Sequence, residues 1–166
     1  MSKGIARILG IAVLLAGASI SSAFAQGAAQ GCIVLKSIAE VEQEVVNDKG
    51  EKTVKRVLAD KVVPGVEVIW TVSANNICKQ PSDKVTINNA VPAHMTYVAS
   101  SATGAGADIT YSLDGKTFGN AEQLTVQDNG ATRKARADEY KHIRWIFKNS
   151  LQPGATALAS FRAVLN

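Results

Sequence analysis

The sequence has few of the residues that catalytic and nucleic-acid-binding sites need. Only two of its 166 residues are histidine, two are cysteine, and the aromatic share is 5%. His94 and His142 stand in no hydrolase, zinc or nucleotide-loop motif. Few aromatics leave few stacking platforms for bases, and basic residues are spread among acidic ones rather than forming a stripe. We therefore expect no catalytic site, cofactor, bound metal or nucleic-acid partner.

The only long apolar run lies at the amino terminus and is short for a membrane span. Lys3 and Arg7 precede the apolar residues 8–16, and the small-residue pattern Ala23-Phe24-Ala25 follows. A basic amino-terminal region, a short apolar core and an A-x-A cleavage motif are typical of a signal peptide, whereas a membrane-spanning helix needs about 20 apolar residues. We predict that residues 1–25 are a signal peptide cleaved before Gln26. The mature chain then has no transmembrane segment and is periplasmic, on the outer surface or extracellular.

Both cysteines, Cys32 and Cys78, follow the predicted leader. Exported chains usually meet an oxidising compartment in which thiols pair, so we expect one disulfide between them. Such a bridge closes a loop of about 45 residues, for which chain-entropy arguments give about 4 kcal/mol of stabilisation. Two unpaired thiols are the alternative, because a zinc site would need further close-spaced ligands.

Apolar and polar residues alternate with a period of two, and no window carries a sustained helical stripe. The clearest strands are residues 66–72 and residues 143–147. Antiparallel strands joined by short turns predict an all-β fold, an immunoglobulin-like antiparallel β-sandwich. Trp70 and Trp145 are expected to meet in its core. The predicted core residues are Val68, Trp70, Val72, Tyr97, Trp145 and Phe161.

Residues 26–62 predict an N-terminal strand and β-hairpin, and residues 63–166 predict the sandwich, with both parts in one folded unit. Three glutamates alternate with apolar residues over 39–45, and Asn47-Asp48-Lys49-Gly50 provides the turn. The return arm, residues 51–58, should bring its cations toward the glutamate side. These cations are Lys52, Lys55 and Arg56.

A polar segment, residues 127–138, is expected to be a mobile loop because it has little to bury. Its cations are candidate contacts for an anionic polymer such as a cell-surface polysaccharide. They are Arg133, Lys134 and Arg136. A calcium site built from Asp108, Asp114 and Asp128 is a weaker alternative, because these aspartates lack the ligand spacing of a calcium-binding loop and suit ordinary turns.

Six fragments occur in an informative order along the chain. They are residues 63–72 (Val-Pro-Gly-Val-Glu-Val-Ile-Trp-Thr-Val), 91–98 (Val-Pro-Ala-His-Met-Thr-Tyr-Val), 101–104 (Ser-Ala-Thr-Gly), 111–115 (Tyr-Ser-Leu-Asp-Gly), 143–145 (Ile-Arg-Trp) and 151–154 (Leu-Gln-Pro-Gly). Together they resemble the conserved-repeat family called domain of unknown function 11, an immunoglobulin-like module of prokaryotic surface proteins. The resemblance covers about residues 60–166, in a single copy. It implies a cell-envelope or extracellular location and a structural or adhesive role.

These observations lead to one functional expectation with one alternative. We expect a non-catalytic, exported cell-envelope protein with a structural, adhesive or assembly role, acting through protein partners or self-association. The alternative is a stand-alone periplasmic binding module for an envelope partner or a polysaccharide. An oligomer favours the first, and a concentration-independent monomer favours the second.

Overall fold

The computed structural model describes residues 31–166, and the predicted signal peptide lies outside these residues. The described chain is built from ten strands and one short 3-10 helix. In chain order they are β1 (Ile33–Val46), β2 (Lys52–Leu58), β3 (Glu67–Asn76), β4 (Thr86–Ala90), β5 (Met95–Tyr97), β6 (Ala107–Ser112), β7 (Thr125–Asp128), β8 (Ala131–Lys134), η1 (Ala137–Glu139), β9 (His142–Phe147) and β10 (Thr156–Leu165). No α-helix occurs in this part of the chain.

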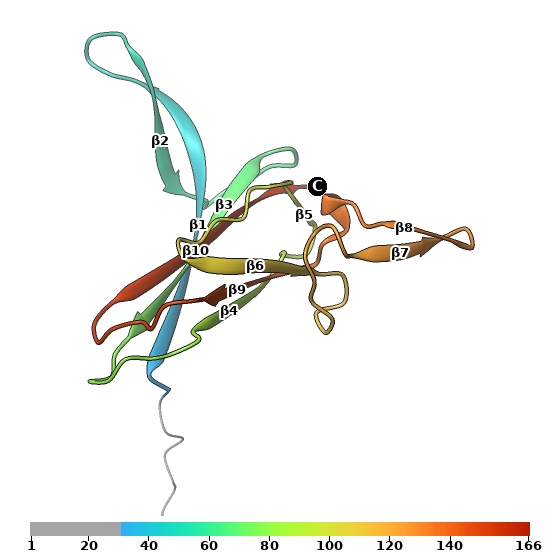
Figure 1. Ribbon diagram of the computed structural model, residues 1–166. Coiled ribbons are helices and arrows are strands. Elements are labelled where there is room, and N and C mark those ends of the chain that lie inside the picture. The colour runs from blue at the N-terminus through green and yellow to red at the C-terminus, as the bar shows by residue number, and fades with distance from the viewer. Residues whose placement is uncertain (1–30) are drawn as a thin grey trace, which may run out of the picture. The chain divides into compact units, whose positions relative to one another are not determined.

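The strands form two main antiparallel sheets and one small hairpin (Figure 1). The larger sheet has the order β2-β1-β3-β10-β5, the second has the order β4-β9-β6, and β7 pairs with β8. The last strand, β10, lies between β3 and β5, so the sheet is not assembled in chain order. The prediction of an all-β, antiparallel sandwich is confirmed.

The core lies between the inner faces of the two main sheets. Phe161 of β10 lies opposite Trp70 of β3, and its ring centroid is 6.2 Å from that of Trp145 on β9. Five of the six expected core side chains are at most 3% exposed, whereas Trp70 is half-buried. The aromatic partner of Trp145 is therefore Phe161, which lies beside Trp70 in the sheet. Small residues flank Phe161 on the same face, Ala159 and Ala163, and leave room for the indole.

A disulfide joins Cys32 to Cys78, with their Cα atoms 5.1 Å apart. It lies just beyond the end of the β1–β3 ladder, where Ile33 pairs with Asn76. The fully buried Asn76 amide donates to the carbonyls of Gln80 and Leu151, each at 2.8 Å, and its oxygen accepts the N–H of Cys78. This end of the sandwich is thus held by a covalent bond and by a buried amide whose hydrogen bonds are satisfied.

The segment expected to be a mobile loop is ordered as a hairpin instead. Asn129 and Gly130 have φ angles of 50° and 83°, which close the two-residue turn between β7 and β8. Leu124 before the hairpin and Ala135 after it are each 8% exposed and belong to the core. The prediction was wrong because a polar segment was taken to be unstructured. One apolar residue at each end of the hairpin is enough to anchor it to the core.

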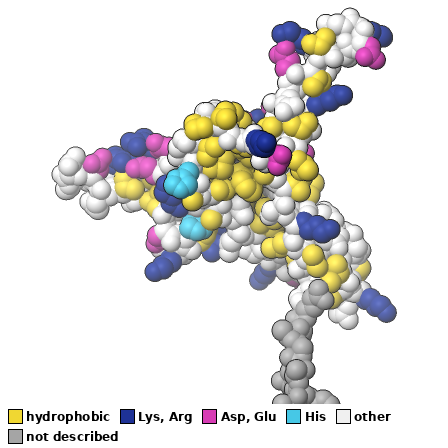
Figure 2. All heavy atoms as spheres, turned by 180° about the vertical axis from the view of Figure 1, so that it is seen from behind, with side chains coloured by type: hydrophobic (Ala, Val, Ile, Leu, Met, Phe, Trp, Pro, Cys, Tyr) yellow, Lys and Arg dark blue, Asp and Glu magenta, His cyan; other side chains and the backbone are white. Residues whose placement is uncertain are grey.

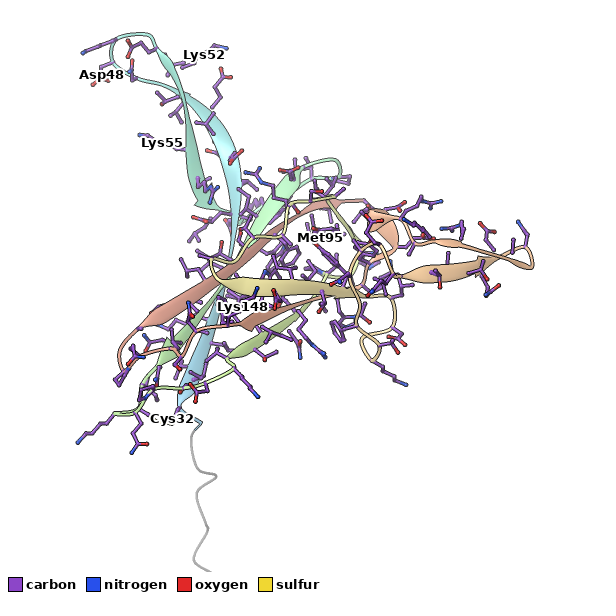
Figure 3. The ribbon with its side chains drawn as sticks, viewed as in Figure 1. Cys32, Asp48, Lys52, Lys55, Met95 and Lys148 are labelled. Atoms are coloured by element: carbon purple, nitrogen blue, oxygen red, sulfur yellow. A yellow bond between two sulfur atoms is a disulfide. The ribbon has the colours of Figure 1, made fainter. Side chains whose placement is uncertain are left out.

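The hairpin of β1 and β2 stands out from the sandwich (Figures 1 and 3). Residues 33–40 of β1 pair with β3, whereas residues 41–46 pair only with β2. At its tip, Asn47 Oδ1 accepts the N–H groups of Lys49 and Glu51, and Gly50 adopts a φ of 78°. The hairpin was expected from the sequence, but Lys55 was not placed correctly. It lies opposite Gln43 on the side of the hairpin away from the glutamates.

Candidate interaction surface

The outer face of the five-stranded sheet exposes several large apolar side chains. Residues paired across antiparallel strands point to the same side, so the register identifies the side chains of this face. Five large apolar residues on it are between 45% and 71% exposed: Ile38, Val46, Val54, Leu58 and Leu158. Figure 2 shows hydrophobic and charged side chains next to each other along the protruding hairpin. On this face the exposed apolar side chains alternate with charged ones such as Glu42 and Arg56, a mixture that a protein partner could cover.

An ion-pair network crosses the same face. Arg162 of β10 donates to Glu67 at 2.6 Å and reaches over β3 to Glu42 of β1 at 2.9 Å. Its hydrogen bonds hold the pKa of Glu42 below the ordinary value. Ile69 of β3 lies between these two strands in the register, and it is only 2% exposed although it belongs to the outer face. The long Arg162 side chain therefore covers an isoleucine that would otherwise face water.

A groove of about 770 Å³ hollows this face beside the network. Its floor includes the hydroxyls of Thr71 and Ser160, 3.3 Å apart. One wall is the segment 101–106, which is held against β10 by paired backbone hydrogen bonds between Thr103 and Ser160. Arg56 and Arg162 also line the groove. Hydroxyls and guanidinium groups in one groove can hydrogen-bond a polar ligand such as a sugar.

The three cations proposed as anion contacts lie on or beside the β7–β8 hairpin, and each is ion-paired there. Arg133 contacts Asp128 at 2.8 Å and Glu139 at 2.7 Å. These hydrogen bonds from Arg133 lower the pKa of Glu139 to about 2. Lys134 contacts Glu122, and Arg136 contacts Asp138. An anionic ligand would have to compete with these carboxylates.

The two histidines lie in a turn and at the start of a strand. His94 adopts a φ of 62° in the turn before β5, and its carbonyl accepts the N–H of Asn166. His142 begins β9 and lies against Gly115, where an added Cβ would come within 2.7 Å of the ring. Between Gly31 and Asn166, no group of three or more His, Cys, Asp or Glu side chains could hold a metal ion.

The three aspartates considered for calcium serve separate local contacts. Asp108 pairs with Lys148 at 2.7 Å, and Asp128 pairs with Arg133. Asp114 Oδ1 accepts the N–H groups of Lys116 and Thr117 and the hydroxyl of Ser112. These hydrogen bonds lower the pKa of Asp114 to about 2. This is ordinary turn chemistry in the loop that follows β6.

The groove and the ion-pair network were missed in the sequence. Glu42, Glu67 and Arg162 belong to three different strands, and nothing in the local alternation shows that these strands are neighbours. The only available signal was the run of alternating glutamates in residues 40–44, which indicated a charged strand face. Its most distant partner, Arg162, lies 120 residues from Glu42.

No family model matches the chain, and no curated protein or solved structure shows significant similarity to it. Within residues 31–166, none of the helical structure is long and apolar enough to cross a membrane.

Proposed function

We propose that this chain is a non-catalytic protein exported to the cell envelope, where it has a structural, adhesive or assembly role through protein partners or copies of itself. The observation that supports this most is the set of exposed apolar side chains that lie on the outer sheet face and on the hairpin. Ile38, Val54 and Leu58 are 45%, 65% and 71% exposed on that surface. Burying such side chains against a partner is favourable by about 25 cal/mol for each Å² removed from water.

Export is supported by the cysteine chemistry and by the predicted leader. The Cys32–Cys78 bridge suits an oxidising compartment, and residues 1–25 have the sequence order of a signal peptide. The pattern-level resemblance to the surface-protein family of domain of unknown function 11 implies the same location. Cell fractionation followed by mass measurement of the amino terminus tests this part of the proposal. We expect an exported product that begins at Gln26, whereas an uncut chain in the cytoplasm would contradict it.

The groove supports a second candidate function, a stand-alone periplasmic module that binds an envelope partner or a polysaccharide. Its lining by Thr71, Ser160 and Arg56 offers hydrogen-bond donors and acceptors in a concave site. This alternative needs no self-association and leaves the exposed hairpin without a role. Arg133, Lys134 and Arg136 remain a predicted second contact for such a polymer.

Light scattering coupled to size-exclusion chromatography separates the two candidates. The purified protein with its disulfide intact is measured across a range of concentrations. An assembly role predicts a mass that rises with concentration, and replacing Val54 by Asp on the protruding hairpin should reduce that rise. A mass that stays at one chain at every concentration would favour the stand-alone module.

A further inference from the structure

Three residues of β1 form a short charged and apolar pattern on the outer sheet face. Lys36, Ile38 and Glu40 point to the same side, because each is two residues from the next and they lie opposite Ser73, Thr71 and Ile69 of β3. Ile38 at the centre is 45% exposed. Along the strand, Lys36 and Glu40 are about 13 Å apart, which is four residues at about 3.3 Å each.

Lys36 and Glu40 differ from the other charges of this face in having no ion-pair partner within residues 31–166. Glu42, Glu67 and Arg162 are joined in one network, Arg56 contacts Glu42 at 3.6 Å, and Lys52 contacts Glu44 at 2.5 Å. The face therefore satisfies its charges internally except at the two positions that flank Ile38. Glu40 lies where β1 is paired on both sides, with Leu58 of β2 and Ile69 of β3, whereas Lys36 lies where β1 is paired with β3 alone.

The pattern Lys36-Ile38-Glu40 is complementary to a second copy of itself that runs antiparallel. A two-fold axis at Ile38 places Lys36 of one copy opposite Glu40 of the other, and Glu40 opposite Lys36, because the spacing on both sides of Ile38 is the same. A parallel alignment of the two strands would place like charges together. The face as a whole carries four acidic and four basic side chains, so two copies have no net repulsion. These are Glu40, Glu42, Glu44 and Glu67 with Lys36, Lys52, Arg56 and Arg162.

We propose that a second copy of this chain docks on the outer face of the five-stranded sheet, with the two β1 strands antiparallel across the interface. Ile38 then packs against Ile38 of the second copy, and two Lys36–Glu40 ion pairs flank this contact. Leu58 and Leu158, which are 71% and 56% exposed on the same face, extend the apolar contact to both sides of β1. Packed sheets lie about 10 Å apart, a gap that lysine and glutamate side chains bridge together. The inference rests on the proposed assembly role and names the surface that would serve it.

Charge reversal tests the pairing directly. The variants Lys36→Glu and Glu40→Lys each place like charges in both pairs, so each should weaken self-association by about tenfold or more in sedimentation velocity. The double variant K36E/E40K restores both pairs and should associate within about threefold of the parent. An equimolar mixture of the two single variants also restores both pairs, but only between unlike chains. With one variant labelled by a fluorophore, a heterodimer should form more tightly than either homodimer.

The matched control is Lys55→Glu, because Lys55 is an exposed lysine on the opposite side of the hairpin. It changes the net charge as Lys36→Glu does and should leave association unchanged. Circular dichroism of every variant checks that the fold is retained, and neither Lys36 nor Glu40 has an ion pair within the described chain whose loss would disturb it.

The outcomes separate this inference from the proposed function. If the parent associates but both single variants associate equally well, the docking face is wrong while the assembly role stands. The docking face is also wrong if mixing the two single variants gives no heterodimer. It is wrong as well if association is lost only when strand pairing along the free edge of β2 is blocked. If the parent is a monomer at all concentrations, the docking face and self-association are both overturned, and the proposed function is left with protein partners other than a second copy.

Discussion

Arg162 reaches across β3 to Glu42, so two strands that are not neighbours in the sheet are joined by one side chain. The two pairs that Arg162 forms, with Glu42 and Glu67, are partly exposed at every member. Their hydrogen bonds raise the pKa of Arg162 above an already high value, so this charge persists at all accessible pH. The contact connects the base of the protruding hairpin to the strand at the carboxyl end of the chain.

Replacing Arg162 by Ala should lower the free energy of unfolding by about 1–2 kcal/mol. Each exposed pair contributes up to about 1 kcal/mol, and the lost side chain also uncovers Ile69. Urea denaturation of dilute protein measures the change, and high salt should reduce the part due to charge. Arg56→Ala, which loses only one contact of 3.6 Å, should cost less. Equal losses for the two variants would contradict the assigned role of Arg162.

Reduction of the Cys32–Cys78 bridge should lower the melting temperature. The bridge spans 46 positions of the chain, and a loop of this length corresponds to about 4 kcal/mol in the chain-entropy account. Thermal unfolding followed by circular dichroism, with and without a reductant, measures the effect. Cys32→Ser/Cys78→Ser should match the reduced protein. Unchanged melting, with two titratable thiols detected in the untreated protein, would show that no bridge forms.

Gly104 is predicted to be intolerant of even a methyl group. A Cβ at this position would lie 2.7 Å from Cδ1 of Trp145, whose ring is fully buried in the core. Gly104→Ala should therefore destabilise the fold by about 1–3 kcal/mol and alter the tryptophan fluorescence. Gly119→Ala is the matched control, because its nearest neighbour would be at an ordinary 3.5 Å. A stable Gly104→Ala with unchanged fluorescence would refute the close approach of this loop to the indole.

Asp114 should contribute to the acid sensitivity of the fold. Hydrogen bonds from Thr117, Lys116 and Ser112 lower its pKa from 3.8 to about 2 in the folded state. A lowered folded pKa stabilises the protein above the unfolded pKa, and this stability is lost as the pH falls from about 4 to about 2. Asp114→Asn should therefore flatten the fall in melting temperature over that window.

Glu139 titrates in the same window, so Asp114→Asn should remove only part of the acid dependence. A carbon-13 NMR titration reports the carboxyl group of Asp114 directly. An ordinary value near 4 would show that the Ser112–Thr117 turn does not hold the carboxylate in solution.

Local features of the sequence were sufficient to predict most of the strands and several turns, but not the β7–β8 hairpin. The alternation over residues 66–72 and 143–147 placed Val68, Val72 and Trp145 inward, because successive side chains of a strand point to opposite sheet faces. Asn47 to Gly50 predicted the first hairpin, because these residues tolerate the backbone that a tight reversal needs. Lys55 was misplaced because a shift of one residue moves a side chain to the other face.

The sequence by itself determined most of the strands and several turns, since both depend on neighbours within a few positions. Only the tertiary structure decided that β10 lies between β3 and β5, that Arg162 meets Glu42, and that the exposed apolar residues share one sheet face with Lys36 and Glu40. The reason is physical: strand order and register arise from pairing between segments far apart in the chain, and the period-two pattern of one strand carries no record of its partner.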